Sequence, residues 1–80
     1  MEIQLIQGIF SSNDALTLIT QMIETKIKFH ENKINLCSAV EDIKNRESKI
    51  KHLQNVLFEL RNNLNVEKSK VNIEALIKID

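Results

Sequence analysis

The chain contains almost nothing that would break a helix. It has no proline, and Gly8 is its one glycine among 80 residues. Because Pro and Gly interrupt helices more strongly than any other residues, their absence after residue 8 favours long, continuous helices. Hydrophobic residues make up 42% of the chain and charged residues 28%, which is typical of a globular protein rather than a disordered one.

Residues 12–36 have the spacing of an amphipathic helix. Ser11 stands at the predicted N-cap, with Asp14 three residues later as its capping-box partner and Phe10 at the position of a hydrophobic staple. At roughly 100° per residue the apolar positions form two stripes, about 120° apart around the helix. The first stripe contains Leu16, Ile19, Ile23, Ile27 and Ile34, and the second contains Leu18, Met22, Phe29 and Leu36. One partner helix needs only a narrow seam, so the two stripes predict two packing surfaces.

A second helix is predicted over residues 39–64. Ser38 and Glu41 have the spacing of a capping box at its start, and asparagines at 62, 63 and 65 favour its end. A coiled-coil-like seam runs along it at Ile43, Ile50, Leu53, Leu57, Leu60 and Leu64. The two helices, each about 35 Å long at 1.5 Å per residue, are therefore expected to form an antiparallel αα-hairpin.

The two ends of the chain predict short strands, at residues 2–10 and 70–79. Apolar residues alternate in both segments, and a strand is favoured over a helix at the C-terminal end. Gly8 would permit a bulge or a tight bend before the first helix. The expected fold is thus one mainly α (α+β) domain over residues 1–80. In it the strands flank the hairpin and, if they pair, run antiparallel, within one chain or between two.

A second copy of the chain is expected to complete this fold. A two-stranded ribbon alone is marginal in water, and so short a chain buries little surface. The single Cys37 excludes an internal disulfide, and no Cys and His residues have the spacing of zinc ligands. We therefore expect a homo-oligomer, most simply a homodimer, with no metal and no cofactor.

Composition also argues against several functional classes. No catalytic or phosphate-loop motif is present, so we expect no enzymatic activity. The formal net charge is zero, which gives no electrostatic footprint for nucleic acid. The sequence has neither an apolar stretch long enough to span a bilayer nor a secretory signal at its start, so we expect a cytoplasmic protein without a membrane contact.

A polar strip on the first helix is the most informative feature for a site. Lys26, His30, Lys33 and Cys37 lie between the two apolar stripes, and an antiparallel hairpin brings Asp42, Arg46 and Lys49 opposite them, near the turn. In a structural interpretation, Lys33 pairs with Asp42 and the long side chains cover apolar surface with their stems. In a functional interpretation, a small anion or an acidic peptide binds to Lys26, His30, Lys33 and Arg46.

His30 itself allows two interpretations. It is either a buried structural histidine or a proton switch or ligand contact, because imidazole titrates near neutral pH. His52 is expected about seven positions away from His30 along the hairpin axis, roughly 10 Å at 1.5 Å per residue. Zinc lies about 2.1 Å from an imidazole nitrogen, so the two histidines of one chain are not expected to share a metal ion.

Short sequence elements give one resemblance. Gly8-Ile9-Phe10-Ser11, then Ala15, and then Lys26-Ile27-Lys28-Phe29-His30 resemble short, uncharacterised bacterial proteins that have a K-I-x-F-H element in a long helical hairpin. The resemblance implies a small bacterial protein and no particular activity. The leading functional prediction is a non-catalytic, homo-oligomeric interaction or regulatory protein that presents a helical surface to a protein partner. The alternative is a small-ligand or anion-binding protein that uses the polar strip.

Overall fold

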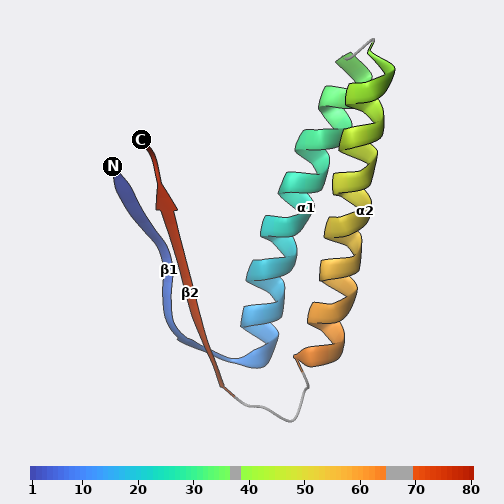
Figure 1. Ribbon diagram of the computed structural model, residues 1–80. Coiled ribbons are helices and arrows are strands. Elements are labelled where there is room, and N and C mark those ends of the chain that lie inside the picture. Colours follow the sequence, from blue (N-terminus) through green and yellow to red (C-terminus); the bar gives the residue numbers. More distant parts are fainter. Residues whose placement is uncertain (37–38, 65–69) are drawn as a thin grey trace.

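The computed structural model describes residues 1–36, 39–64 and 70–80 (Figure 1). Strand β1 (Glu2–Phe10) leads into helix α1 (Ser12–Leu36), which is followed by helix α2 (Val40–Asn63) and strand β2 (Val71–Lys78). The predicted fold class is confirmed: a long antiparallel helical hairpin is flanked by an antiparallel pair of N- and C-terminal strands.

The start of α1 is fixed by the predicted cap. The backbone N–H of Asp14 donates a hydrogen bond to Oγ of Ser11 over 3.1 Å, and the N–H of Ala15 donates to the carbonyl of Ser11 over 2.9 Å. Ser11 therefore satisfies one of the N–H groups that the first turn of a helix leaves without a partner.

Helix α2 begins one residue later than predicted. Ala39 occupies its N-cap position and provides no side-chain cap, while its carbonyl accepts a hydrogen bond from the N–H of Ile43 over 3.2 Å. Ser38, which we expected to cap this helix, lies outside the described residues. At the other end Asn63 is the last helical residue, and the N–H of Leu64 closes the final turn on the carbonyl of Leu60 over 2.9 Å.

The C-terminal segment is a strand, and it pairs with β1 within one chain. The register matches Ile3 with Ile77, Gly8 with Ile73, and Phe10 with Val71. A pair of hydrogen bonds beyond the strands, each 2.8 Å long, joins the backbone of Met1 to that of Ile79. The register shift falls between Gln4 and Ile6 rather than at the glycine, so Gly8 stays in the ladder with a φ of +137°.

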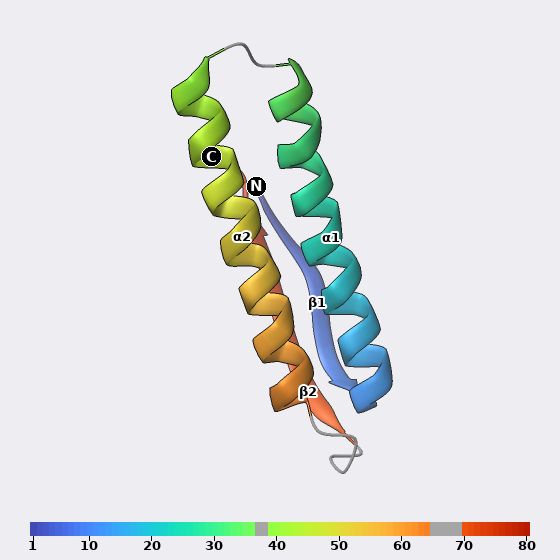
Figure 2. The ribbon, with the colours of Figure 1, turned by 90° about the vertical axis from the view of Figure 1, so that its right-hand side faces the viewer.

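The hairpin and the ribbon form two layers that diverge. They meet near the start of α1, and the ribbon then leans away from the helices toward the two termini (Figures 1 and 2). Among the described residues the buried hydrophobic side chains are Ala15, which is 0% exposed, and Ile73, which is 9% exposed. Toward the C-terminus the exposed fraction rises to 39% at Ile77 in β2 and to 51% at Ile79, just after the strand. The core therefore lies where the two layers meet, and we use the term wedge for the diverging arrangement of hairpin and ribbon.

Within residues 1–36, 39–64 and 70–80, no helix is both long enough and apolar enough to cross a membrane.

Candidate functional site

His30 is the most deeply buried ionisable side chain of the two helices. It lies on the side of α1 that contacts α2, and it is 6% exposed. Nη1 of Arg46 on α2 lies 3.0 Å from Nδ1 of His30. Because a guanidinium group only donates hydrogen bonds, Nδ1 must accept this one, and the neutral ring then carries its proton on Nε2. Arg46 thus selects the tautomer of His30.

The proton on Nε2 has no acceptor in the part of the chain that the structure describes. Nε2 of His30 is buried, and no hydrogen-bond partner for it exists among the described residues. Buried polar groups in folded proteins are nearly always paired, so an orphaned donor of this kind indicates a missing partner such as water or a ligand.

The surroundings keep the His30 ring neutral. Burial lowers the pKa of His30 from its ordinary value of 6.5, and the positive charges of Arg46, Lys49 and Lys26 lower it further. Both effects act against a second proton on the ring, because burial and like charges each disfavour the charged form. At neutral pH His30 is therefore a fixed N–H donor.

Phe29 contacts three members of this cluster. Its ring meets that of His30 edge to face, with the centroids 5.5 Å apart and an interplanar angle of 69°. Nζ of Lys33 lies 5.7 Å from the Phe29 centroid, and Cζ of Arg46 lies 5.9 Å from it. These distances are within the range of cation–π attraction, so the ring positions both cations.

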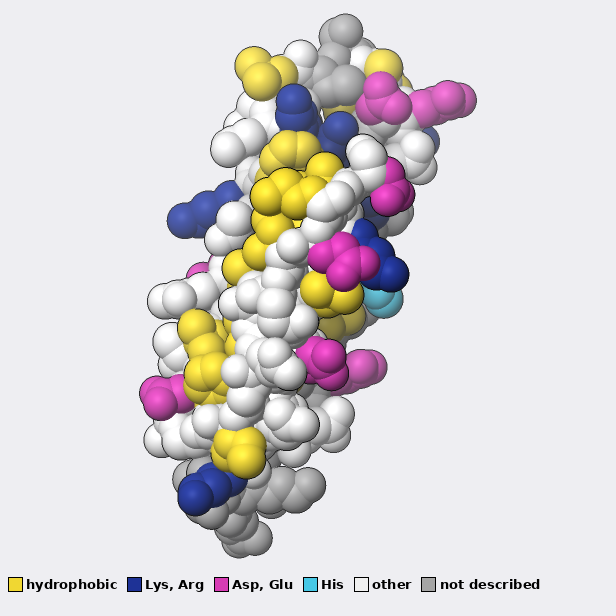
Figure 3. Space-filling view, turned by 90° about the vertical axis from the view of Figure 1, so that its left-hand side faces the viewer, with side chains coloured by type: hydrophobic (Ala, Val, Ile, Leu, Met, Phe, Trp, Pro, Cys, Tyr) yellow, Lys and Arg dark blue, Asp and Glu magenta, His cyan; other side chains and the backbone are white. Residues whose placement is uncertain are grey.

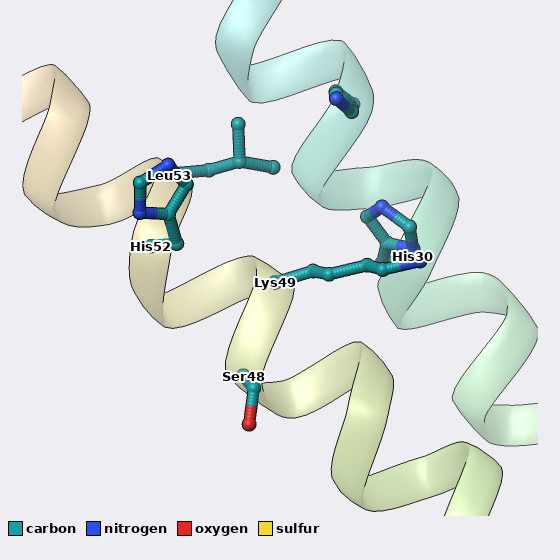
Figure 4. A pocket seen from close by; sticks show the side chains of 6 residues that line it. His30, Ser48, Lys49, His52 and Leu53 are labelled. Carbon is teal, nitrogen blue, oxygen red and sulfur yellow. The ribbon is translucent and has the colours of Figure 1, made fainter.

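A hollow of about 390 Å³ opens between the helices beside His30. In Figure 4 the side chain of Lys49 reaches from α2 toward His30, and Leu53 points toward α1. Ser48 points away from this contact. The residues that line the hollow are Lys26, His30, Ser48, Lys49, His52 and Leu53.

The structure divides the predicted site residues between two places. Lys26 and His30 line the hollow, and Arg46 holds the His30 ring. Lys33 lies over Phe29 instead and is not among the lining residues. The pairing of Lys33 with Asp42 stays a prediction, and Cys37, the last member of the predicted strip, lies outside the described residues.

Lys49 and His52 are two of the lining residues that the sequence prediction of the site did not include. Lys49 was placed opposite the polar strip but was not counted as a ligand contact, and His52 was expected to lie well away from His30 along the axis. Both line the same hollow as His30. The spacing of Lys49, His52 and Leu53 at i, i+3 and i+4 puts them on one face of α2, which is the signal that could have identified them.

Comparisons of the chain with protein-family models, with curated proteins and with solved structures found no match. What the chain does is therefore inferred from its own residues.

Proposed function

We propose that the chain is a non-catalytic, homo-oligomeric interaction protein in which a second copy fills the wedge between hairpin and ribbon. The observation that carries this proposal is the surface of a single copy. The folded chain exposes 6464 Å², whereas a compact monomer of 9.3 kDa exposes about 5,000 Å². The difference of roughly 1,500 Å² exceeds the roughly 800 Å² that one partner buries in a standard interface.

The shape of the chain supports the same conclusion. Its radius of gyration is 15.2 Å and its dimensions are 46 × 33 × 13 Å, whereas a compact domain of 80 residues has a radius of gyration of about 12 Å. A flat, open molecule of this kind buries too little apolar area to offset the entropy lost on folding, and a second copy supplies the missing contact area.

Apolar side chains mark the surface that would be covered. A groove of about 350 Å³ lies between β1 and α1, and Leu5 and Met22 are exposed in it. Hydrophobic side chains also reach the surface along the ribbon side of the molecule, as Figure 3 shows. The groove is lined by Leu5, Ile6, Leu18, Gln21, Met22 and Thr25.

Two further properties favour a second copy as the occupant. The sheet has two strands in the described part of the chain, so each strand keeps one edge whose backbone groups can pair with another strand. The formal net charge is zero, so copies of the chain are not held apart by net electrostatic repulsion. Contact with a different protein through the outer helical faces stays a prediction from the sequence.

Sedimentation equilibrium at micromolar concentration tests the proposal. The expected mass is that of two or more chains. Met22→Glu should shift the mass toward one chain, because the new carboxylate is exposed in a single copy but would be buried in the assembly. Thr17→Glu is the matched control: it adds the same charge at an exposed position of α1 outside the groove and should leave the mass unchanged. A well-folded wild-type chain with the mass of one copy at the highest concentration reached would overturn the proposal.

A further inference from the structure

We propose that the hollow between α1 and α2 binds the phosphate group of a small molecule through Lys26, Lys49 and the Nε2–H of His30. This site does not depend on the proposed assembly. It combines a fixed buried donor, two flexible cations and an apolar wall.

The hydrogen-bond donor of the site is the Nε2–H group of His30. His30 is more than nine-tenths buried and lines the hollow, and its Nε2 has no partner among the described residues. Arg46 occupies Nδ1, so Nε2 is the ring nitrogen that remains to donate a hydrogen bond to a ligand. A donor that is already oriented loses little entropy when an acceptor oxygen arrives, so it favours a bound oxyanion.

The positive charge around the hollow determines which class of anion binds there best. Lys26 and Lys49 line the hollow from opposite helices, and the residues that line it in the described part of the chain include no Asp or Glu. Arg46 adds a third positive charge behind the imidazole. A phosphate monoester carries about −1.5 to −2 charges at pH 7, whereas a carboxylate carries one. The excess of cations therefore favours phosphate over carboxylate.

The volume of the hollow indicates that the phosphate is part of a larger molecule. A hollow of about 390 Å³ falls at the small end of the range for ligand pockets, roughly 300–1,000 Å³. Leu53, half-buried and directed toward α1, offers an apolar surface. An organic group attached to the phosphate can pack there.

Nuclear magnetic resonance can follow the site directly. The His30 Nε2–H signal is recorded while inorganic phosphate, phenyl phosphate or acetate is added at constant ionic strength and pH. We expect both phosphates to move this signal saturably in the millimolar range, with phenyl phosphate tighter, and acetate to bind at least about tenfold more weakly. Absence of a saturable shift, or equal affinity for acetate and phosphate, would overturn the proposal.

Two lysine variants test whether phosphate binds at the hollow or only to the general positive charge of the surface. Lys49→Met should weaken phosphate binding by about tenfold, as expected when a charged hydrogen-bond partner is lost. Lys28→Met is the matched control, because it removes the same charge from an exposed position of α1 that does not line the hollow. If both variants weaken binding equally, the lysines act only as a diffuse positive surface and the proposal is wrong. Both lysines are exposed, so neither change should unfold the chain.

The same samples distinguish this proposal from the proposed function. Sedimentation of the wild type with and without phosphate reports the number of copies independently of binding. If a single copy of the chain binds phosphate, the phosphate site is supported and the proposed homo-oligomer is wrong. If the chain is a stable oligomer and the His30 signal shows no saturable shift, the homo-oligomer is supported and the phosphate site is wrong.

Discussion

Nη1 of Arg46 donates to Nδ1 of His30 across the helical hairpin, over 3.0 Å and a separation of 16 residues. This bond explains how a histidine can be buried between two helices next to several cations. The guanidinium satisfies one ring nitrogen, and its positive charge adds to the effect of burial, which is the larger one, in disfavouring a second proton on the ring. It also leaves Nε2–H as a ring donor without a partner among the described residues.

Replacing Arg46 should change the titration of His30. Arg46→Met removes a nearby positive charge and should raise the pKa of His30, although burial, Lys49 and Lys26 still hold it below 6.5. Arg46→Lys keeps the charge and should keep the pKa low, but it loses the guanidinium that fixes the tautomer. The ¹⁵N shifts of the imidazole report both properties. Arg61→Met, at the exposed end of α2, is the control, and an equal pKa change there would contradict the assignment.

Stability should depend on the charge of His30 at mildly acidic pH. The pKa of His30 is lower in the folded chain than its ordinary value of 6.5, so the unfolded chain binds the extra proton first. The free energy of unfolding should therefore be highest above pH 6.5 and fall as the pH drops from 6.5 through the lower, folded-state pKa. Urea unfolding at a series of pH values in a non-phosphate buffer measures this slope. His30→Gln should remove it, while His52→Gln should leave it in place.

Ser11 should stabilise the first turn of α1. Ser11→Ala removes the acceptor of the Asp14 N–H and should lower the free energy of unfolding by about 1 kcal/mol. Ser48→Ala is the matched control, because Ser48 lies exposed in the middle of α2, where alanine is a better helix former. Urea unfolding followed by circular dichroism compares the two variants. A loss that is equal in both would show that the cap does not contribute.

Gly8 should resist replacement because of its backbone. Its φ of +137° lies where L-residues are strained, and an added Cβ would meet no atom within 4 Å. Gly8→Ala should therefore lower the free energy of unfolding by about 1–3 kcal/mol through backbone strain rather than through a clash. A synthetic chain with D-alanine at this position adds the same methyl group but favours positive φ, and it should retain its stability. Equal losses for the two alanines would rule out the backbone explanation.

Local sequence patterns predicted the elements well because local interactions determine them. The Ser11 cap, the apolar period of residues 12–36 and the alternation near the C-terminus each depend on neighbours a few residues away. The errors were also local. Ala39 takes the N-cap position of α2 without a side-chain cap, and the register shift falls between Gln4 and Ile6 although the glycine is at position 8. A bulge depends on how two strands pair, and no single segment specifies that pairing.

The sequence alone determined two long helices, two terminal strands, and the presence of His30 on an otherwise apolar helical face. Only the tertiary structure decided that Lys49 and His52 share a hollow with His30, that Lys33 turns to Phe29, and that the two layers diverge to leave apolar surface exposed. The reason is geometric. The repeat of a helix fixes which residues share a face, but the rotation and offset of one helix against another arise from packing along the whole contact.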